Sequence, residues 1–140
     1  MTINEIQDEL IEDFSFYQDW MEKYEFIIQL GKELPLINEA NRQDQYIIKG
    51  CQSKVWLVPE IKDDKLTFTA DSDAVITKGL VSLMVKVLSG HTPKEIANAD
   101  LYFIDQIGLK EHLSPTRANG LLSMVKQMKL YAIALQANAS

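Results

Sequence analysis

The sequence predicts an α+β domain in which a three-stranded antiparallel sheet packs against N-terminal and C-terminal helices. Apolar residues recur every three or four positions at both ends of the chain, which is the spacing of amphipathic helices. The middle of the chain holds short β-rich runs separated by turn residues. Strands grouped between helices, without alternation, are typical of an antiparallel sheet. Since 140 residues is the usual length of one domain, we expect a single domain over residues 1–140.

Two helices are predicted in the N-terminal part. Thr2 and Glu5 match a capping box at the start of the first helix. Ser15 with Gln18 would cap the second helix, and Gly31 would end it. The apolar stripe of this region comprises Ile3, Ile6, Leu10, Phe14, Tyr17, Met21 and Tyr24.

Three short runs predict the strands of the sheet, at residues 46–48, 55–61 and 66–70. Residues 62–65, Lys-Asp-Asp-Lys, predict a tight hairpin turn between the second and third strands. Residues 50–53 must turn the chain between the first two strands. Cys51 is therefore expected at the tip of a loop.

Helices are predicted again after the sheet. Residues 71–73 offer N-cap candidates for a helix that would end at Gly90. Residues 92–95 match a capping box with proline in the first turn of a short helix. Residues 114–115 repeat the pattern before a long helix whose inner side would carry Leu121, Leu122, Val125, Met128, Ala132 and Leu135.

Composition excludes several classes of function. Lys and Arg number 14 against 20 Asp and Glu, a net charge of −6 that gives no general attraction to nucleic acid or to an anionic membrane. No apolar run is long enough to span a membrane, and the first residues lack the pattern of a signal peptide, so we expect a cytoplasmic protein. One Cys and two His are too few for a structural zinc site or a cluster, so no metal site is expected.

Cys51 is the first candidate for chemistry, and the residues alone leave two interpretations. A lone cysteine in a reducing compartment is most often a small buried hydrophobic residue. Cys51 instead follows Gly50 on a predicted turn, and loops held by a rigid sheet are where reactive groups concentrate. Lys49 and Lys54 flank it, and nearby cations favour the thiolate.

Three other side chains are candidates beside the thiol. His91 and His112 could act as a base in a cysteine hydrolase, but that class is the weaker one. We expect His91 to be a solvated turn residue and His112 to order the start of the last helix. Arg117 lies in the first turn of that helix, where the dipole disfavours a cation. It is therefore either solvated, or paired in a way that supports the loop or attracts the thiolate.

Five motifs in order resemble one known family. They are Gly50-Cys51-Gln52-Ser53-Lys54-Val55-Trp56, Asp71-Ser72-Asp73-Ala74, Lys78-Gly79-Leu80, Gly90-His91-Thr92-Pro93 and His112-Leu113-Ser114-Pro115-Thr116-Arg117-Ala118-Asn119-Gly120-Leu121. Together they resemble the SufE family of cysteine desulfurase sulfur acceptors, over nearly the whole chain. The family more often has Lys where His91 stands, and Ser where Thr116 and Ala118 stand.

The resemblance implies a sulfur carrier in iron–sulfur cluster assembly that has no cofactor of its own and no independent turnover. A pyridoxal-phosphate cysteine desulfurase would hold sulfur as a persulfide. Cys51 would accept the outer sulfur, stimulate the desulfurase and pass the sulfur to an iron–sulfur scaffold, with Arg117 as a supporting residue. The family's fold is also similar to that of iron–sulfur scaffold proteins. The loop and partner-binding positions would be Gly50, Gln52, Ser53 and Lys54.

The alternative is a regulatory module that binds the desulfurase while Cys51 stays inert. A persulfide is easily reduced or oxidised, so a carrier gains by holding its loop beside apolar surface. Burial raises the pKa of a thiol, however, and shelter therefore conflicts with activation. We expect partner binding to move the loop outward. The sequence leaves open a homodimer, the identity of the desulfurase and the identity of the scaffold.

Overall fold

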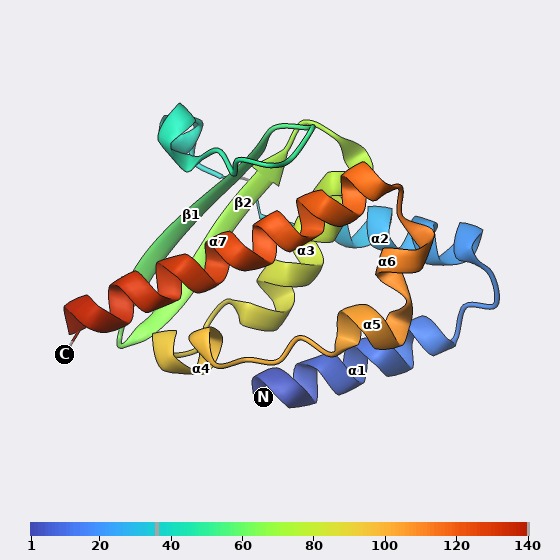
Figure 1. Cartoon of the computed structure of the whole chain (residues 1–140), viewed down its shortest axis with the longest axis horizontal. Coiled ribbons are helices and arrows are strands. Elements are labelled where there is room, and N and C mark those ends of the chain that lie inside the picture. The colour runs from blue at the N-terminus through green and yellow to red at the C-terminus, as the bar shows by residue number, and fades with distance from the viewer. Residues whose placement is uncertain (36, 140) are drawn as a thin grey trace.

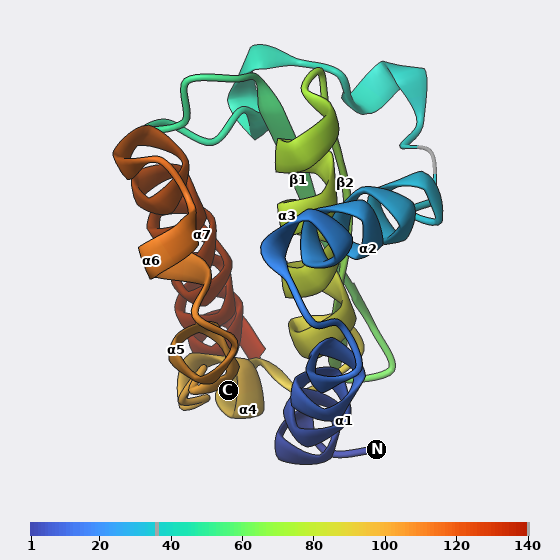
Figure 2. The ribbon, with the colours of Figure 1, turned by 90° about the vertical axis from the view of Figure 1, so that its right-hand side faces the viewer.

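The computed structural model describes residues 1–35 and 37–139, with side chains placed up to residue 136 (Figure 1). In Figure 2, helices α4 to α7 lie on one side of the central helix α3, α2 crosses α3, and the two-stranded hairpin lies behind α3. In chain order the elements are α1 (Ile3–Ser15), α2 (Trp20–Lys32), η1 (Glu39–Asn41), η2 (Asp44–Tyr46), β1 (Val55–Lys62), β2 (Lys65–Ser72), α3 (Val75–Leu88), α4 (Pro93–Ala97), α5 (Phe103–Ile107), α6 (Leu109–His112) and α7 (Pro115–Ala139).

The hairpin is antiparallel, and its register runs from Val55 opposite Ser72 to Lys62 opposite Lys65. Asp63 and Asp64 form its turn with φ of 53° and 64°. Two consecutive residues with positive φ are the pattern of a type I′ turn, whose twist matches that of paired strands. The predicted turn at residues 62–65 is confirmed.

The predicted third strand is wrong, because the described residues form a sheet of two strands. Of the run at 46–48, Ile47 makes one isolated bridge to Trp56, and the N–H of Ile48 donates to the Val55 carbonyl at 2.9 Å. The preceding segment is tied down differently, since the Arg42 guanidinium donates to Asp71 and lies 5.0 Å from the Trp56 ring centroid. These contacts anchor the segment at one end of the hairpin, so the run does not continue along β1.

Helix α3 is the centre of the core, and its backbone crosses α2 at two glycines. A Cβ at Gly79 would lie 2.3 Å from the Ile27 carbonyl oxygen, and a Cβ at Gly31 would lie 2.8 Å from the Gly79 nitrogen. Gly31 was expected to end α2, but the helix continues to Lys32 and Gly31 serves this close contact. The crossing fixes α3, whose N-terminal half helps to form the site. Its fully buried side chains include Leu80, Val81, Leu83, Met84, Val87 and Leu88.

The helix starts are partly as predicted. The capping boxes that begin at Thr2 and Thr92 are both present. The cap expected at Ser15 is wrong, because Asp19 caps α2 by accepting from the Glu22 N–H at 2.9 Å. The Ser15 hydroxyl instead donates to the backbone carbonyl of the preceding turn. Ser15 therefore closes α1 and does not open α2.

The long helix α7 turns one side to the core and leaves another in solvent. Leu121, Met128 and Ala132 are buried as predicted, and Met124 joins them. Leu122 was expected inside, but its side chain is 44% exposed. Among the residues described, no helix is both long enough and apolar enough to cross a membrane.

Candidate functional site

The loop that carries Cys51 lies directly on α7. Gly50 has φ of +91°, a left-handed conformation that strains other residues. A Cβ there would lie 2.5 Å from the Ser123 Oγ. At the other end of the loop, the Lys54 N–H donates to Asp73 Oδ1 at 3.0 Å, and the Ser72 hydroxyl donates to the Lys54 carbonyl at 2.8 Å. The loop is thus held at both ends.

These contacts correct the expectation that residues 71–73 cap α3. Its N-cap is Ala74, which makes no side-chain capping bond. Asp73 holds the loop, while buried Asp71 pairs with Arg42 and lies 3.3 Å from the Lys78 Nζ. Burial raises the pKa of Asp71, but the Arg42 guanidinium, the backbone N–H of Ser72 and the nearby Lys78 ammonium outweigh burial and lower that pKa overall. The acidic motif thus connects the sheet, α3 and the loop.

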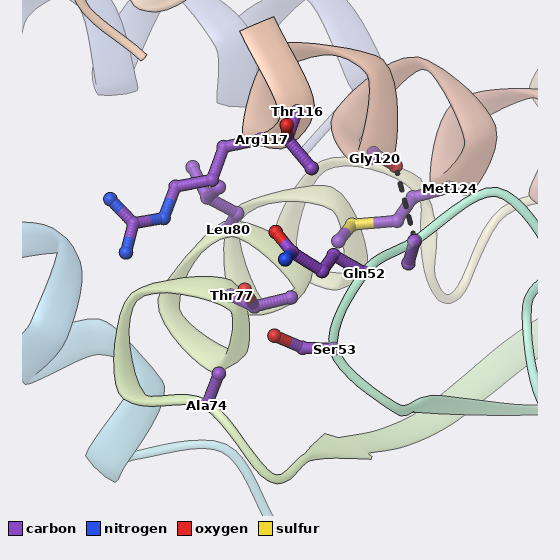
Figure 3. A pocket seen from close by; sticks show the side chains of 10 residues that line it. Gln52, Ser53, Ala74, Thr77, Leu80, Thr116, Arg117, Gly120 and Met124 are labelled. Carbon is purple, nitrogen blue, oxygen red and sulfur yellow. Dashed lines mark hydrogen bonds between the residues drawn. The ribbon is translucent and has the colours of Figure 1, made fainter. Parts of the chain in front are cut away.

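The Cys51 thiol is half-buried at a pocket of about 90 Å³. Its Sγ lies 3.5 Å from the Gly120 carbonyl oxygen, a contact that Figure 3 marks with a dashed line. Gly120 leaves room beside the sulfur, because a Cβ there would also lie 3.5 Å from Sγ. The pocket is lined by Cys51, Gln52, Ser53, Ala74, Thr77, Leu80, Thr116, Arg117, Gly120 and Met124.

Burial raises the pKa of the Cys51 thiol. Of the two opposing effects expected at this thiol, activation by Lys49 and Lys54 and shelter by burial, burial sets the direction of the pKa shift in this conformation. At neutral pH the thiol is protonated and weakly nucleophilic. Exposure of the thiol to solvent would raise its thiolate fraction and with it the nucleophilicity of Cys51.

The residues predicted from sequence fall into two groups. Gln52, Ser53 and Arg117 line the pocket with Cys51. Gly50 and Lys54 are not among the lining residues, and they hold the ends of the loop instead. Arg117 is exposed, and in Figure 3 its side chain extends outward, away from Gly120 and Met124. Its backbone N–H is capped by the Ser114 hydroxyl at 3.3 Å, as the motif at 114–115 predicted.

Neither histidine lines the pocket of the thiol. His91 was expected in solvent, but it is buried, its backbone bridges Leu66, and burial lowers the pKa of its imidazole. The His112 ring stacks on Trp20 with centroids 4.0 Å apart and contacts the Gly108 carbonyl, so it holds α6 against α2. Within the described part of the chain, no group of three or more His, Cys, Asp or Glu side chains is arranged to hold a metal ion.

Sequence reasoning missed the helical residues behind the thiol. Gly120 and Met124 lie one helical turn apart on α7, and Ala74, Thr77 and Leu80 are spaced by three along the start of α3. Both spacings put side chains on one helix face. That spacing was visible in the sequence, but which helix faces the loop was not.

A family model described as "SufE: Fe-S metabolism associated domain" matches residues 8–132. The chain belongs to the SufE family. Two curated SufE relatives, both uncharacterized SufE-like proteins, come from Rhizobium meliloti and Rhizobium etli. Each is 42% identical over 127 residues and covers 87% of this chain, with 91% and 86% of the relatives' own lengths matched.

A solved structure shows the same fold as this SufE chain. It is the solution structure of a hypothetical protein from Thermus thermophilus, with a TM-score of 0.77. The match covers 96% of this chain and 97% of that one, at 16% sequence identity. The likeness supports the α+β arrangement of helices around an antiparallel hairpin. At this identity it carries information on fold and none on activity.

Proposed function

We propose that this SufE family member takes sulfur from a pyridoxal-phosphate cysteine desulfurase onto Cys51 and passes it to an iron–sulfur scaffold. Membership of the family places the chain in iron–sulfur metabolism. One observation supports the finer role: the chain's single thiol sits on an anchored loop over a small pocket with free space beside the sulfur. The protein would act as a carrier in the cytoplasm, with no cofactor of its own and no independent turnover.

The transfer is a sulfur displacement of the same kind as disulfide exchange. The Cys51 thiolate attacks the outer sulfur of the desulfurase persulfide and forms a new S–S bond. The bond between the outer and inner sulfurs breaks, and the desulfurase cysteine leaves as a thiolate. The proton lost from Cys51 goes to solvent, so the step needs no external oxidant or reductant. Passage to the scaffold repeats the displacement with Cys51 as the leaving group.

The pocket would shelter the persulfide between the two displacements. Leu80 and Met124 give it apolar lining, and the space beside Gly120 adjoins the Cys51 sulfur. The same burial keeps the thiol protonated, which slows acceptance. We therefore propose that the desulfurase draws the loop outward when it docks. The loop then returns with its sulfur covered.

The test is Cys51→Ala in an assay of alanine release by the desulfurase. The carrier role predicts that wild-type protein accelerates turnover and that the variant does not, because the enzyme's persulfide has no acceptor. The variant should keep its fold, with a loss of unfolding free energy well below the 2 kcal/mol or more of a truncated core residue. Retained acceleration by Cys51→Ala would instead support the regulatory module with an inert thiol.

A further inference from the structure

A second groove adjoins the Cys51 loop further along α7 than the pocket of the thiol. It has a volume of about 440 Å³ and lies between the segment before the loop and α7. Lys49 belongs both to this groove and to the loop, and Ser123 lines the groove and lies against Gly50. A molecule seated here would touch the loop at its first residues. The groove is lined by Gln45, Ile47, Lys49, Ser123, Lys126, Gln127, Leu130 and Tyr131.

The exposed side of α7 extends this groove with apolar side chains. Leu122, Leu130 and Ile133 are 44%, 48% and 55% exposed. At about 100° per residue they fall within about 80° of one another around the helix, and they span about 16 Å along it. Exposed apolar residues gathered on one helix face mark a contact surface for another macromolecule. A stripe of this length is too long for a small anion.

The charge around this surface is opposite to that of the whole chain. The charged residues that line the groove are Lys49 and Lys126, and α7 contains no Asp or Glu. The net charge of the chain is −6, so two cations without a carboxylate reverse the sign of the charge at the groove. None of the described residues that line the groove is acidic. Its complement is therefore a partner with apolar side chains flanked by carboxylates.

We propose that the groove and the exposed stripe of α7 form the docking surface for an acidic, apolar-centred segment of the sulfur-donating desulfurase. This inference rests on the proposed function. The donor is the favoured occupant because the resting thiol is protonated and half-buried. A partner seated against Lys49 and Gly50 is placed to displace the loop before sulfur is transferred.

The experiment measures the dissociation constant of the source organism's desulfurase by calorimetry, in a Cys51→Ser background that removes the transfer chemistry. Lys49→Glu/Lys126→Glu reverses two exposed charges on the surface and should weaken binding about tenfold or more at low salt. Lys32→Glu/Lys86→Glu makes the same charge change at exposed positions of α2 and α3 and should change binding less than about twofold. Rising salt should narrow the difference between the two variants.

Several outcomes would overturn the proposal. The first is that both double variants weaken desulfurase binding equally. The second is that the Cys51→Ser protein does not bind the desulfurase at all. The third is that the protein forms a dimer which Lys49→Glu/Lys126→Glu dissociates and Lys32→Glu/Lys86→Glu does not. The last result would assign the surface to a second copy of this chain. Failure of the proposed function is separate: binding that responds to Lys49 and Lys126, without sulfur ever reaching Cys51, keeps the docking surface and removes the carrier role.

Discussion

Replacing Gly120 with alanine should stabilise the protein and impair its chemistry at the same time. A glycine inside a helix costs about 1 kcal/mol relative to alanine. The new Cβ would lie 3.5 Å from the Cys51 Sγ and 3.9 Å from its Cα and Cβ, which are ordinary van der Waals contacts. We therefore expect a gain of about 1 kcal/mol, which raises the melting temperature by about 4 °C for a chain of this length.

The same methyl group fills the space beside the thiol, where a second sulfur would lie. Thermal unfolding gives the stability, and intact-mass spectra after mixing with desulfurase and cysteine give the rate of sulfur loading. Gly120→Ala should load several-fold more slowly than wild type. Asn119→Ala raises helix propensity at the neighbouring exposed position without facing the thiol, and it should load normally. A lower melting temperature for Gly120→Ala, or unchanged loading, would refute the geometry described for the pocket.

Two further variants test the rim of the pocket and the ion pairs beside it. Arg117→Ala should slow sulfur loading at every desulfurase concentration, while its unfolding free energy changes by less than about 1 kcal/mol. Arg117→Lys should restore little of the loading rate, because an ammonium lacks the planar, multi-donor geometry of a guanidinium. If Arg117→Ala loads sulfur as fast as wild type, Arg117 is a solvated side chain with no role in transfer. The pKa of Asp71 is lowered in the folded protein from its ordinary value of 3.8. The ionised carboxylate therefore stabilises the fold fully above about pH 4, and this contribution is lost as the pH falls through the lower folded pKa. In denaturant titrations Asp71→Asn should thus be less stable than wild type at pH 7, with the difference shrinking below pH 4, and a difference independent of pH would contradict the ion pairs.

Local signals predicted the elements whose geometry is local. The turn at Asp63 and Asp64 and the capping boxes at Thr2 and Thr92 depend on residues three or four apart, so the sequence was enough to place them. The N-cap of α2 failed because Ser15 and Asp19 both offer a side-chain acceptor, and the chain uses the second. Neighbouring candidates of equal chemistry are not separated by sequence alone.

Features that depend on distant contacts were not predictable. The run at 46–48 has β-forming residues, but the contacts of Arg42 with Asp71 and Trp56 hold the preceding segment at the end of the hairpin. Gly31 was expected to end α2, but its function is to let the backbones of α2 and α3 approach closely at Gly79. Tertiary contacts override local preference in both cases.

The candidate site shows the same division. Cys51 was found from its position on a turn, and its neighbours Gln52 and Ser53 came with it. The balance between activation by the flanking lysines and shelter stayed open in the sequence, because the lysines are visible there and burial against α7 is not. Gly120 and Met124 were missed as pocket residues for the same reason.

The most direct test of the carrier role is the intact mass of the protein after incubation with a desulfurase and cysteine. We predict the added mass of one or more sulfur atoms, removable by a thiol reductant and located on the peptide that contains Cys51. Cys51→Ser supplies the control, because its hydroxyl is too weak a nucleophile at neutral pH to accept sulfur. No added mass on the wild-type protein, while the desulfurase is turning over cysteine, would contradict the carrier role.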